Sequence, residues 1–145
     1  MDSSYGDYWL TADPAAVNLD IVCDLLRGTY WAANRSREQI ARSVGNSLCF
    51  SVRLADRQIA IARVLTDHGA ASYVCDVVVD GAHRNRGVGE WLMRSVLEHP
   101  AVRDTRVLVV TRDAQPFYGN LGFVTHPFEC MVRGAEGDAA EAGTC

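Results

Sequence analysis

The segment Val77-Val-Val-Asp-Gly-Ala-His-Arg-Asn-Arg-Gly-Val-Gly-Glu-Trp-Leu-Met-Arg94 joins an apolar strand to an amphipathic helix through a basic turn that contains two glycines. The first N–H groups of a helix have no partner within the helix and carry partial positive charge, so they can bind a phosphate group. Gly87 and Gly89 allow phosphates to approach the backbone closely, and Arg84 and Arg86 add full positive charges. The segment therefore predicts a pyrophosphate site at the start of this helix.

The spacing of the glycines excludes two common phosphate-binding loops. A nucleotide P-loop has four residues between its glycines and then Lys followed by Ser or Thr, and a dinucleotide fingerprint has a third glycine three residues after the second. Neither pattern is present around Arg84-Asn-Arg-Gly-Val-Gly89. The hairpin-like strands that precede the loop also argue against a Rossmann-type nucleotide enzyme.

That loop resembles the Gln/Arg-x-x-Gly-x-Gly/Ala signature of the GNAT acyltransferase superfamily, which binds the pyrophosphate of acetyl-coenzyme A. A second segment, Ala114-Gln-Pro-Phe-Tyr-Gly-Asn-Leu-Gly-Phe123, resembles the other hallmark of this family, a helix that carries a Tyr and ends in Leu-Gly-Phe. The two motifs lie in the family's order and separation. The resemblance extends over roughly residues 5–133.

The resemblance implies a fold and a set of coenzyme A contacts. We expect an α/β (α+β) fold whose mixed, mostly antiparallel central sheet carries helices on both faces, in the order β-α-α-β-β-β-α-β-α-β. One domain would occupy residues 1–133, and residues 134–145 are expected to form a disordered tail because they are rich in Gly, Ala and Glu. In this family the pantetheine arm fits between two separating strands, as an added strand would. The residues expected to bind the coenzyme are Val77, Val78 and Val79 for pantetheine, and Arg84, Asn85, Arg86, Gly87, Val88, Gly89 and Glu90 for pyrophosphate.

The composition is typical of one globular domain without a metal site. The chain has 145 residues and 48% of them are hydrophobic, which is sufficient for an ordinary core. The five cysteines are odd in number and include no CxxC pair, so we expect neither a zinc site nor a disulfide framework. Cys49, Cys75 and Cys130 lie in apolar, strand-like runs and are expected to be buried.

Charge and hydropathy argue against nucleic-acid and membrane partners. The net charge of −4 is unfavourable for binding a phosphate backbone and mildly favours cationic substrates. No apolar run reaches the roughly 18 residues of a membrane span. The first residues, Met1-Asp-Ser-Ser-Tyr5, lack the form of a secretory signal. We therefore expect a cytoplasmic protein.

Local patterns predict alternating strands and helices. Asp13-Pro14 is a helix start, because an N-cap residue precedes Pro at the first helical position, and Ser36 with Gln39 forms a capping-box pattern. The predicted strands are residues 7–11, 48–54, 59–66, 72–80, a buried strand at 106–111 and a closing strand region at 123–133. The predicted helices are residues 15–33, 36–46 and 89–98, and a last helix around Tyr118 that Asp113 caps.

The resemblance implies acyl transfer from a thioester to an amine. Tyr118 matches the position of the family's usual proton donor to the coenzyme A sulfur. A phenol has a pKa near 10 and stays protonated at neutral pH, which suits that role. The alternative is that Tyr118 is a packed helix residue.

Asp76 is a carboxylate inside the apolar run Tyr73-Val-Cys-Asp-Val-Val-Val79. Burying a charge is costly unless the group has a partner or a task. Asp76 could orient the substrate ammonium or accept its proton, or it could form a structural ion pair with a basic neighbour such as Arg63. Asp67 and His68 are expected to be turn residues, although a His facing the cleft would also serve as a base.

The segment Tyr30-Trp31-Ala-Ala-Asn-Arg35 joins the first two predicted helices, a region that selects substrates in this family. Tyr30 and Trp31 could pack an alkyl or ammonium group, and Arg35 could bind a carboxylate, which would suit an amino acid or a related zwitterion. The alternative is that Trp31 anchors the core and Arg35 is a solvated charge.

The hypothesis that follows is an acetyl-coenzyme A-dependent N-acetyltransferase acting on a primary amine of a small molecule by direct attack in a ternary complex. Two other classes stay open. One is a protein Lys or N-terminal acetyltransferase, which would need an open groove, and the other is a non-catalytic acyl-coenzyme A sensor. The sequence is also compatible with a homodimer.

Overall fold

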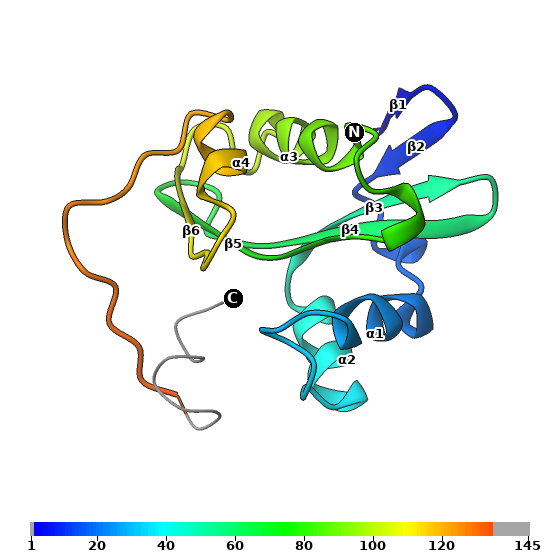
Figure 1. Ribbon diagram of the computed structural model, residues 1–145, viewed down its shortest axis with the longest axis horizontal. Coiled ribbons are helices and arrows are strands. Elements are labelled where there is room, and N and C mark those ends of the chain that lie inside the picture. The colour runs from blue at the N-terminus through cyan, green and yellow to red at the C-terminus, as the bar shows by residue number, and fades with distance from the viewer. Residues whose placement is uncertain (1, 135–145) are drawn as a thin grey trace.

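The structure is a computed structural model that describes residues 2–134. A six-stranded sheet lies between two layers of helices (Figure 1). This mixed, mostly antiparallel sheet with helices on both faces confirms the predicted fold class. All but the first residue of the expected tail at 134–145 lies outside the described residues.

The sheet has the order β1-β2-β3-β4-β5-β6, and every neighbouring pair is antiparallel except β5 and β6, which are parallel. The strands are β1 (Asp2–Tyr5), β2 (Tyr8–Thr11), β3 (Leu48–Leu54), β4 (Arg57–Thr66), β5 (Ala71–Val79) and β6 (Arg106–Val109). The helices are α1 (Leu19–Arg27), α2 (Arg37–Gly45), α3 (Val88–Glu98) and α4 (Gln115–Gly119), with short 3-10 turns η1 (Pro14–Ala16) and η2 (Gly81–His83).

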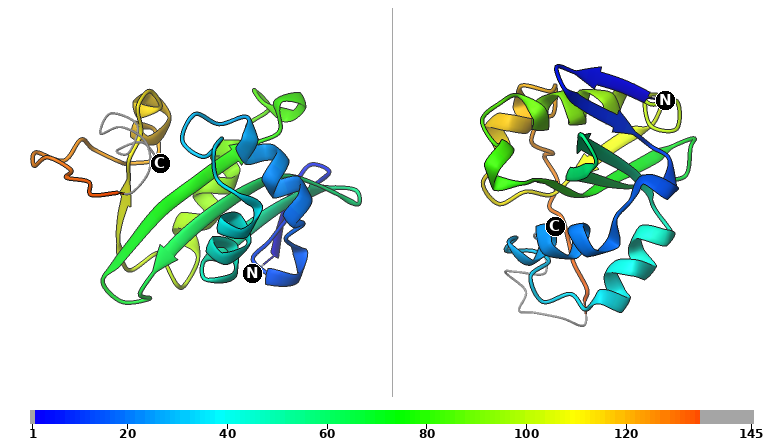
Figure 2. Two further views of the ribbon diagram at one scale, coloured as in Figure 1. Left: turned by 90° about the horizontal axis from the view of Figure 1, so that it is seen from below. Right: turned by 90° about the vertical axis from the view of Figure 1, so that its right-hand side faces the viewer.

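Each face of the sheet is covered by one pair of helices (Figure 2). On one face, Leu92, Met93 and Val96 of α3 are fully buried in the main core. On the other face, Val22 and Leu26 of α1 form a second core with residues of β4 and β5. The two cores place α3 and α1 on opposite sides of β5, the strand that enters the predicted pyrophosphate loop.

β5 contains an irregularity that shapes the site. Arg63 of β4 pairs with Asp76 of β5, but the next pair is Val64 with Val74, so Cys75 is an extra residue on β5. Such a bulge bends the strand and increases its twist. The ladder between β5 and β6 ends where Val74 pairs with Val109, whereas β5 continues to Val79. The last part of β5 therefore has no neighbouring strand on its β6 side within residues 2–134.

The first predicted helix is wrong at both ends. Asp13 caps only the 3-10 turn η1, where its side chain accepts a hydrogen bond from the N–H of Ala15 at 2.9 Å. α1 begins after Asn18, whose side chain accepts from the N–H of Ile21 at 3.2 Å. Gly28 ends the helix, so residues 29–34 form turns and a bend, whereas the prediction had extended the helix to residue 33. The start was predicted too early because Asn18, a second N-cap residue, lies inside the apolar pattern from which the helix was predicted.

The C-terminal part also differs from the prediction. β6 is not a buried strand, because it lies at the sheet edge and Leu108 is 50% exposed. Residues 123–133 contain no strand, and Val124 and Phe128 are largely exposed. Cys130, which was expected to be buried, is exposed, whereas Cys49 and Cys75 are buried as predicted.

Asp113 does not cap the helix that carries Tyr118. No side chain caps α4 at Ala114. The N–H of Ala114 instead donates to the Thr111 hydroxyl at 3.0 Å, which closes the turn between β6 and α4.

Candidate active site

The basic glycine loop forms the start of α3. Gly87 is the N-cap residue and has a left-handed φ of 79°, and no side chain caps the helix. Asn85 is also left-handed, with φ 62°, a conformation that Asn adopts more readily than most residues. The Val88 side chain is buried, and the Glu90 carboxylate pairs with Arg94 at 2.8 Å. Because these two side chains are buried or already paired, Val88 and Glu90 can bind an anion only through their backbone N–H groups.

The β1–β2 hairpin holds this loop at two points. The Tyr5 hydroxyl donates to the Arg86 carbonyl at 3.2 Å, and its ring stacks on Trp91 of α3 with centroids 5.6 Å apart. The Tyr8 hydroxyl lies 2.9 Å from Nδ1 of His83. A Cβ atom at Gly87 would lie 2.7 Å from the Tyr5 oxygen. Gly87 thus supplies both the required φ and the space for the tyrosine.

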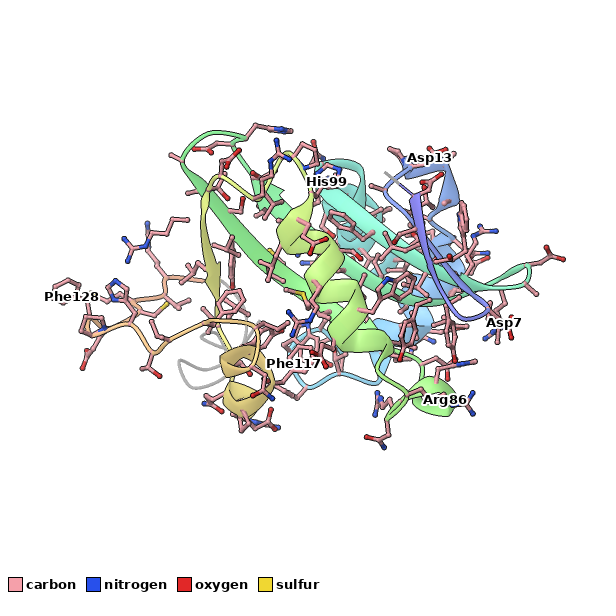
Figure 3. All side chains as sticks on the ribbon, turned by 90° about the horizontal axis from the view of Figure 1, so that it is seen from above. Asp7, Asp13, Arg86, His99, Phe117 and Phe128 are labelled. Carbon is pink, nitrogen blue, oxygen red and sulfur yellow. The ribbon has the colours of Figure 1, made fainter. Side chains whose placement is uncertain are left out.

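The helix that carries Tyr118 approaches the same loop. A Cβ atom at Gly89 would lie 3.8 Å from the Phe117 ring and 3.8 Å from the Val79 side chain. Figure 3 shows Arg86 on the loop before α3, and Phe117 on α4 beside the first half of that helix. Tyr118 is half-buried and makes edge-to-face contacts with Phe117 and Phe123 at 5.0 and 5.5 Å. The end of β5, the start of α3 and α4 therefore meet in one place.

The three valines of β5 alternate between the two cores. Val77 and Val79 pack against the core under α3, and Val78 belongs to the core under α1. The backbone of this segment is hydrogen-bonded to β4 on one side. On the other side, Arg84 Nε donates to the Val79 carbonyl at 3.1 Å. Arg84 is thus held at the end of the unpaired edge instead of projecting freely into solvent.

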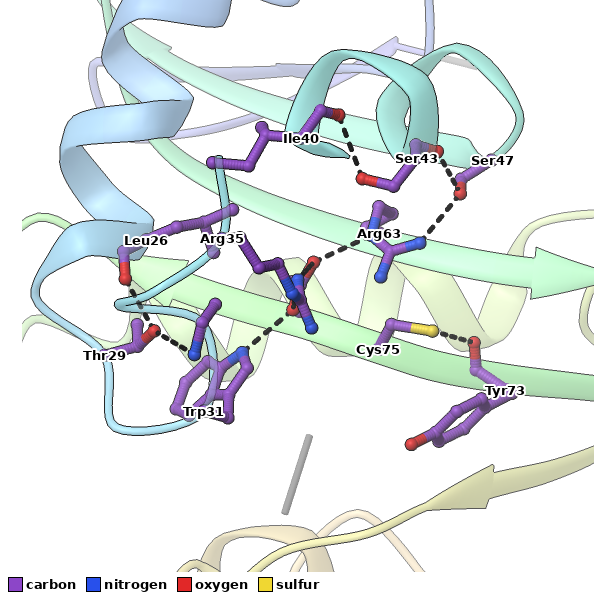
Figure 4. A network of polar contacts seen from close by, with 12 residues as sticks. Leu26, Thr29, Trp31, Arg35, Ile40, Ser43, Ser47, Arg63, Tyr73 and Cys75 are labelled. Atoms are coloured by element: carbon purple, nitrogen blue, oxygen red, sulfur yellow. Dashed lines mark hydrogen bonds and ion pairs between the residues drawn. The ribbon is translucent and has the colours of Figure 1, made fainter. Parts of the chain in front are cut away.

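Asp76 lies two residues before Val78 on β5, on the face that α1 covers, and its carboxylate is shared by Trp31, Arg35 and Arg63, which Figure 4 labels. Arg63 Nε donates to Oδ2 at 2.7 Å, and Trp31 Nε1 donates to Oδ1 at 2.8 Å. Arg35 Nη1 lies 3.0 Å from each oxygen. The carboxylate is 2% exposed. The ion pair with Arg63, one of the roles considered for Asp76, is therefore present.

Burial and charge act in opposite directions on this ion cluster. Burial alone would raise the pKa of Asp76, but Arg63 and Arg35 outweigh it and hold the pKa below its ordinary value. Burial would likewise lower the pKa of Arg63, but Asp76 outweighs it and raises that pKa. Asp76 and Arg63 therefore both stay ionised at neutral pH.

The predicted substrate segment separates into two environments. Trp31 and Arg35 bind Asp76, so neither is a simple core anchor or a solvated charge. The Tyr30 ring packs edge-to-face against Trp31, with centroids 5.0 Å apart, and also contacts the turn between β6 and α4. The Arg112 guanidinium carbon lies 3.8 Å from the Tyr30 ring centroid, and the Arg112 N–H donates to the Tyr30 hydroxyl at 3.3 Å. The α1–α2 connection is thus tied to the segment that follows β6.

The turn residues considered as alternative bases have structural roles. Asp67 Oδ1 accepts the N–H groups of Gly69, Ala70 and Ala71, and these bonds lower its pKa to about 2. His68 occupies a left-handed position with φ 64° in the same turn. The turn therefore holds Asp67 as a local cap.

Comparison with known proteins assigns this fold and site to a family. The model of the acetyltransferase (GNAT) domain matches residues 45–125. The chain belongs to the GNAT family. It is accordingly an acyltransferase, and acetyl-coenzyme A is the co-substrate that the family implies.

Individual relatives agree with this assignment. A GNAT-family acetyltransferase structure from Xanthomonas campestris pv. campestris is 30% identical, covers 88% of this chain and 93% of its own, and has a TM-score of 0.83. A Gibberella zeae protein named as an acetyltransferase is 25% identical over 81% of this chain and 79% of its own length. Glucosamine 6-phosphate N-acetyltransferase 1 of Oryza sativa subsp. japonica is 40% identical, but only over 39% of this chain and 35% of its own length.

Within residues 2–134, no cluster of three or more His, Cys, Asp or Glu side chains could hold a metal ion. In the same part of the chain, no helix has the length and apolarity to cross a membrane. The cytoplasmic location and the homodimer stay predictions.

Replacing Asp76 should show how much its carboxylate contributes to the stability of the fold. We expect Asp76→Asn to lower the free energy of unfolding at pH 7 by about 3–5 kcal/mol, because Arg35 and Arg63 lose their shared carboxylate. The folded pKa of Asp76 is lowered, so its ionisation stabilises the fold above the unfolded pKa of about 3.9, and that stabilisation is lost as the pH falls toward the folded pKa.

Urea unfolding between pH 7 and pH 3 measures this effect, with Asp56→Asn in the exposed β3–β4 turn as the matched control. The stability gap between wild type and Asp76→Asn should narrow at acidic pH. A gap that stays constant, or an equal loss in the control, would show that the Asp76 charge does not stabilise the fold.

Removing the Tyr5 hydroxyl should weaken coenzyme A binding. Tyr5→Phe keeps the ring that stacks on Trp91 but removes the donor to the Arg86 carbonyl. Loss of one such bond predicts about a fivefold rise in Kd by calorimetry. Thr66→Val, which removes a hydroxyl donor to a backbone carbonyl at the end of β4 away from this loop, should leave this Kd unchanged. An unchanged Kd in Tyr5→Phe would mean that the hairpin does not position the loop.

Proposed function

We propose that this protein transfers the acetyl group of acetyl-coenzyme A to a primary amine of a small molecule, an amino acid or a related amine, by direct attack in a ternary complex. The observation that carries the proposal is the course of β5. Its ladder with β6 ends at Val74, and within residues 2–134 no strand lies beside the part of β5 that leads through Val77–Val79 into the glycine loop. An extended pantetheine arm can pair with such an edge as an added strand does.

The pyrophosphate fits the start of α3. The left-handed Gly87 begins a helix that no side chain caps, the N–H groups from Val88 to Glu90 belong to this uncapped start, and Arg86 adds charge. Arg84 also lies at this site, but its Nε is bonded to the Val79 carbonyl. We infer that Arg84 binds phosphate through its other guanidinium nitrogens, so that it links the loop to the end of β5.

In the reaction, the neutral amine nitrogen attacks the thioester carbonyl carbon and the carbon–sulfur bond breaks. We assign the proton that the departing thiolate needs to Tyr118, because α4 lies beside the end of β5 and a phenol is protonated at neutral pH. A backbone N–H near Val78 or Val79 would polarise the thioester carbonyl. The proton that the nitrogen loses passes to water, and water returns a proton to the Tyr118 phenolate.

Asp76 fits a positioning role better than that of a base. Its two oxygens already accept hydrogen bonds from Trp31, Arg35 and Arg63. Burial raises the pKa of Asp76, but the guanidinium groups lower it by more, so that the pKa is below its ordinary value. A carboxylate with these partners has little capacity to take another proton. We therefore propose that Asp76 fixes Trp31 and Arg35 at the acceptor side of β5.

A small acceptor is supported by the contact between Tyr30 and Arg112. This contact joins the α1–α2 connection to the turn before α4, on either side of the region where β5 and β6 separate. A protein substrate would need an open groove at this position. The partial relative that acts on glucosamine 6-phosphate has a name that specifies a small amine, which agrees with this choice.

Thiol release from acetyl-coenzyme A tests both the reaction and Tyr118. We expect free amino acids, polyamines or amino sugars to support release and Lys peptides to fail. Tyr118→Phe should lower turnover about 100-fold with little change in coenzyme A affinity, because only the proton donor is lost.

The melting temperature of Tyr118→Phe serves as the control for folding, since the ring contacts with Phe117 and Phe123 are retained. A fully active Tyr118→Phe would show that Tyr118 is not the proton donor and only packs against its neighbours. Acetylation of Lys peptides alone would replace the small-molecule proposal with a protein-modifying one.

A further inference from the structure

A groove beside α2 opens on the face of the sheet that carries Asp76. It has a volume of about 540 Å³ and is lined mainly by residues of α2, the turn after it and β4. Three arginines, Arg35, Arg42 and Arg63, contribute to its walls. Leu65, which is 44% exposed, adds an apolar patch. The groove is thus predominantly cationic, although the protein as a whole is acidic.

The charges in this groove are not balanced by the described residues. Arg35 and Arg63 both form their ion pairs with one carboxylate, that of Asp76. Arg42 is exposed and has no ion pair within residues 2–134, and Glu38 is the acidic residue among those lining the groove. Two guanidiniums around a single carboxylate leave one positive charge in a largely buried cluster. Such a charge is unfavourable unless an anion compensates it.

The guanidiniums also retain donors for a ligand. Arg63 uses Nε for Asp76 and Nη1 for the Ser47 hydroxyl at 3.0 Å, and Arg35 uses Nη1. Within residues 2–134, Nη2 of neither arginine makes a hydrogen bond. Ser47 in turn donates to the Ser43 carbonyl at 2.6 Å, which fixes the side of the groove formed by α2. The donors are therefore held in place before any ligand binds.

The groove begins where the acyl group is expected. Asp76 follows Cys75, the bulge residue beyond which β5 has no strand on its β6 side. Arg35 and Arg63 contact Asp76 directly, so the cationic wall starts beside the point at which the two strands separate (Figure 4). A molecule with its amine at this point would extend its remaining part over Arg63 toward α2.

We propose that this groove is a subsite for an anionic group, a carboxylate or a phosphate, on the acceptor amine. Arg42 and the Nη2 groups of Arg35 and Arg63 bind the anion, while Leu65 contacts the chain that links it to the amine. The subsite rests on the proposed acetyl transfer and narrows its substrate class to amines that also carry a negative charge.

Matched pairs of amines test the subsite by steady-state kinetics. Butylamine is compared with 4-aminobutyrate, and ethanolamine with O-phosphoethanolamine, so that the two arms distinguish a carboxylate from a phosphate. The anionic member of at least one pair should have a kcat/KM about tenfold higher, as one charge-assisted contact predicts. Arg42→Gln should abolish this preference, read as the ratio of kcat/KM between the two members of each pair. Arg57→Gln, an equal charge change at the exposed start of β4, should retain it.

A binding measurement separates this inference from the proposed function. Amide chemical shifts are followed with inorganic phosphate or acetate in the protein saturated with coenzyme A, which fills the glycine loop. Shifts at Ser43 and Ser47 that disappear in Arg42→Gln support the subsite even if no amine is acetylated, in which case the proposed reaction fails alone. Equal turnover of both members of each pair, without shifts at these residues, overturns the subsite and leaves acetyl transfer standing.

Discussion

The bulge at Cys75 is the constraint on which the other features of this site depend. The extra residue lets Asp76 pair with Arg63 on the α1–α2 face while Val77 and Val79 pack under α3. β6 leaves β5 one residue earlier, at Val74. A regular strand in that position would continue its pairing with β6 and close the edge. The same backbone irregularity therefore accompanies the edge of β5 at which we propose that the coenzyme binds, and it directs the Asp76 carboxylate toward the α1–α2 face.

Two groups of contacts hold the ends of this opened strand. At the far end, the β1–β2 hairpin uses Tyr5 and Tyr8 to fix the loop that precedes α3. Near the bulge, the Asp76 carboxylate joins β4 and β5 to the α1–α2 connection through Arg63, Arg35 and Trp31. Separation of β5 from β6 removes backbone hydrogen bonds, and these side-chain contacts compensate on both faces of the sheet.

The sequence predicted those parts of the fold that depend on local chemistry. The strand at 48–54 and the capping box at Ser36 are as expected, because alternation, turns and caps are short-range signals. The contacts of Tyr5 with Arg86 and of Trp31 with Asp76 span 81 and 45 residues, and no local pattern reports them. The strand expected at 123–133 is absent, because its apolar residues alone do not form a strand when the segment has no neighbouring strand to pair with.

The most direct test of the account is backbone hydrogen exchange with and without coenzyme A, read at single residues. If the edge of β5 beyond its ladder with β6 binds the pantetheine arm, protection should increase within Val77–Val79 and at the start of α3, with no change in the already paired β3. Tight binding that protects only the start of α3 would contradict it, because the coenzyme would then be held by its phosphates without entering the gap between β5 and β6.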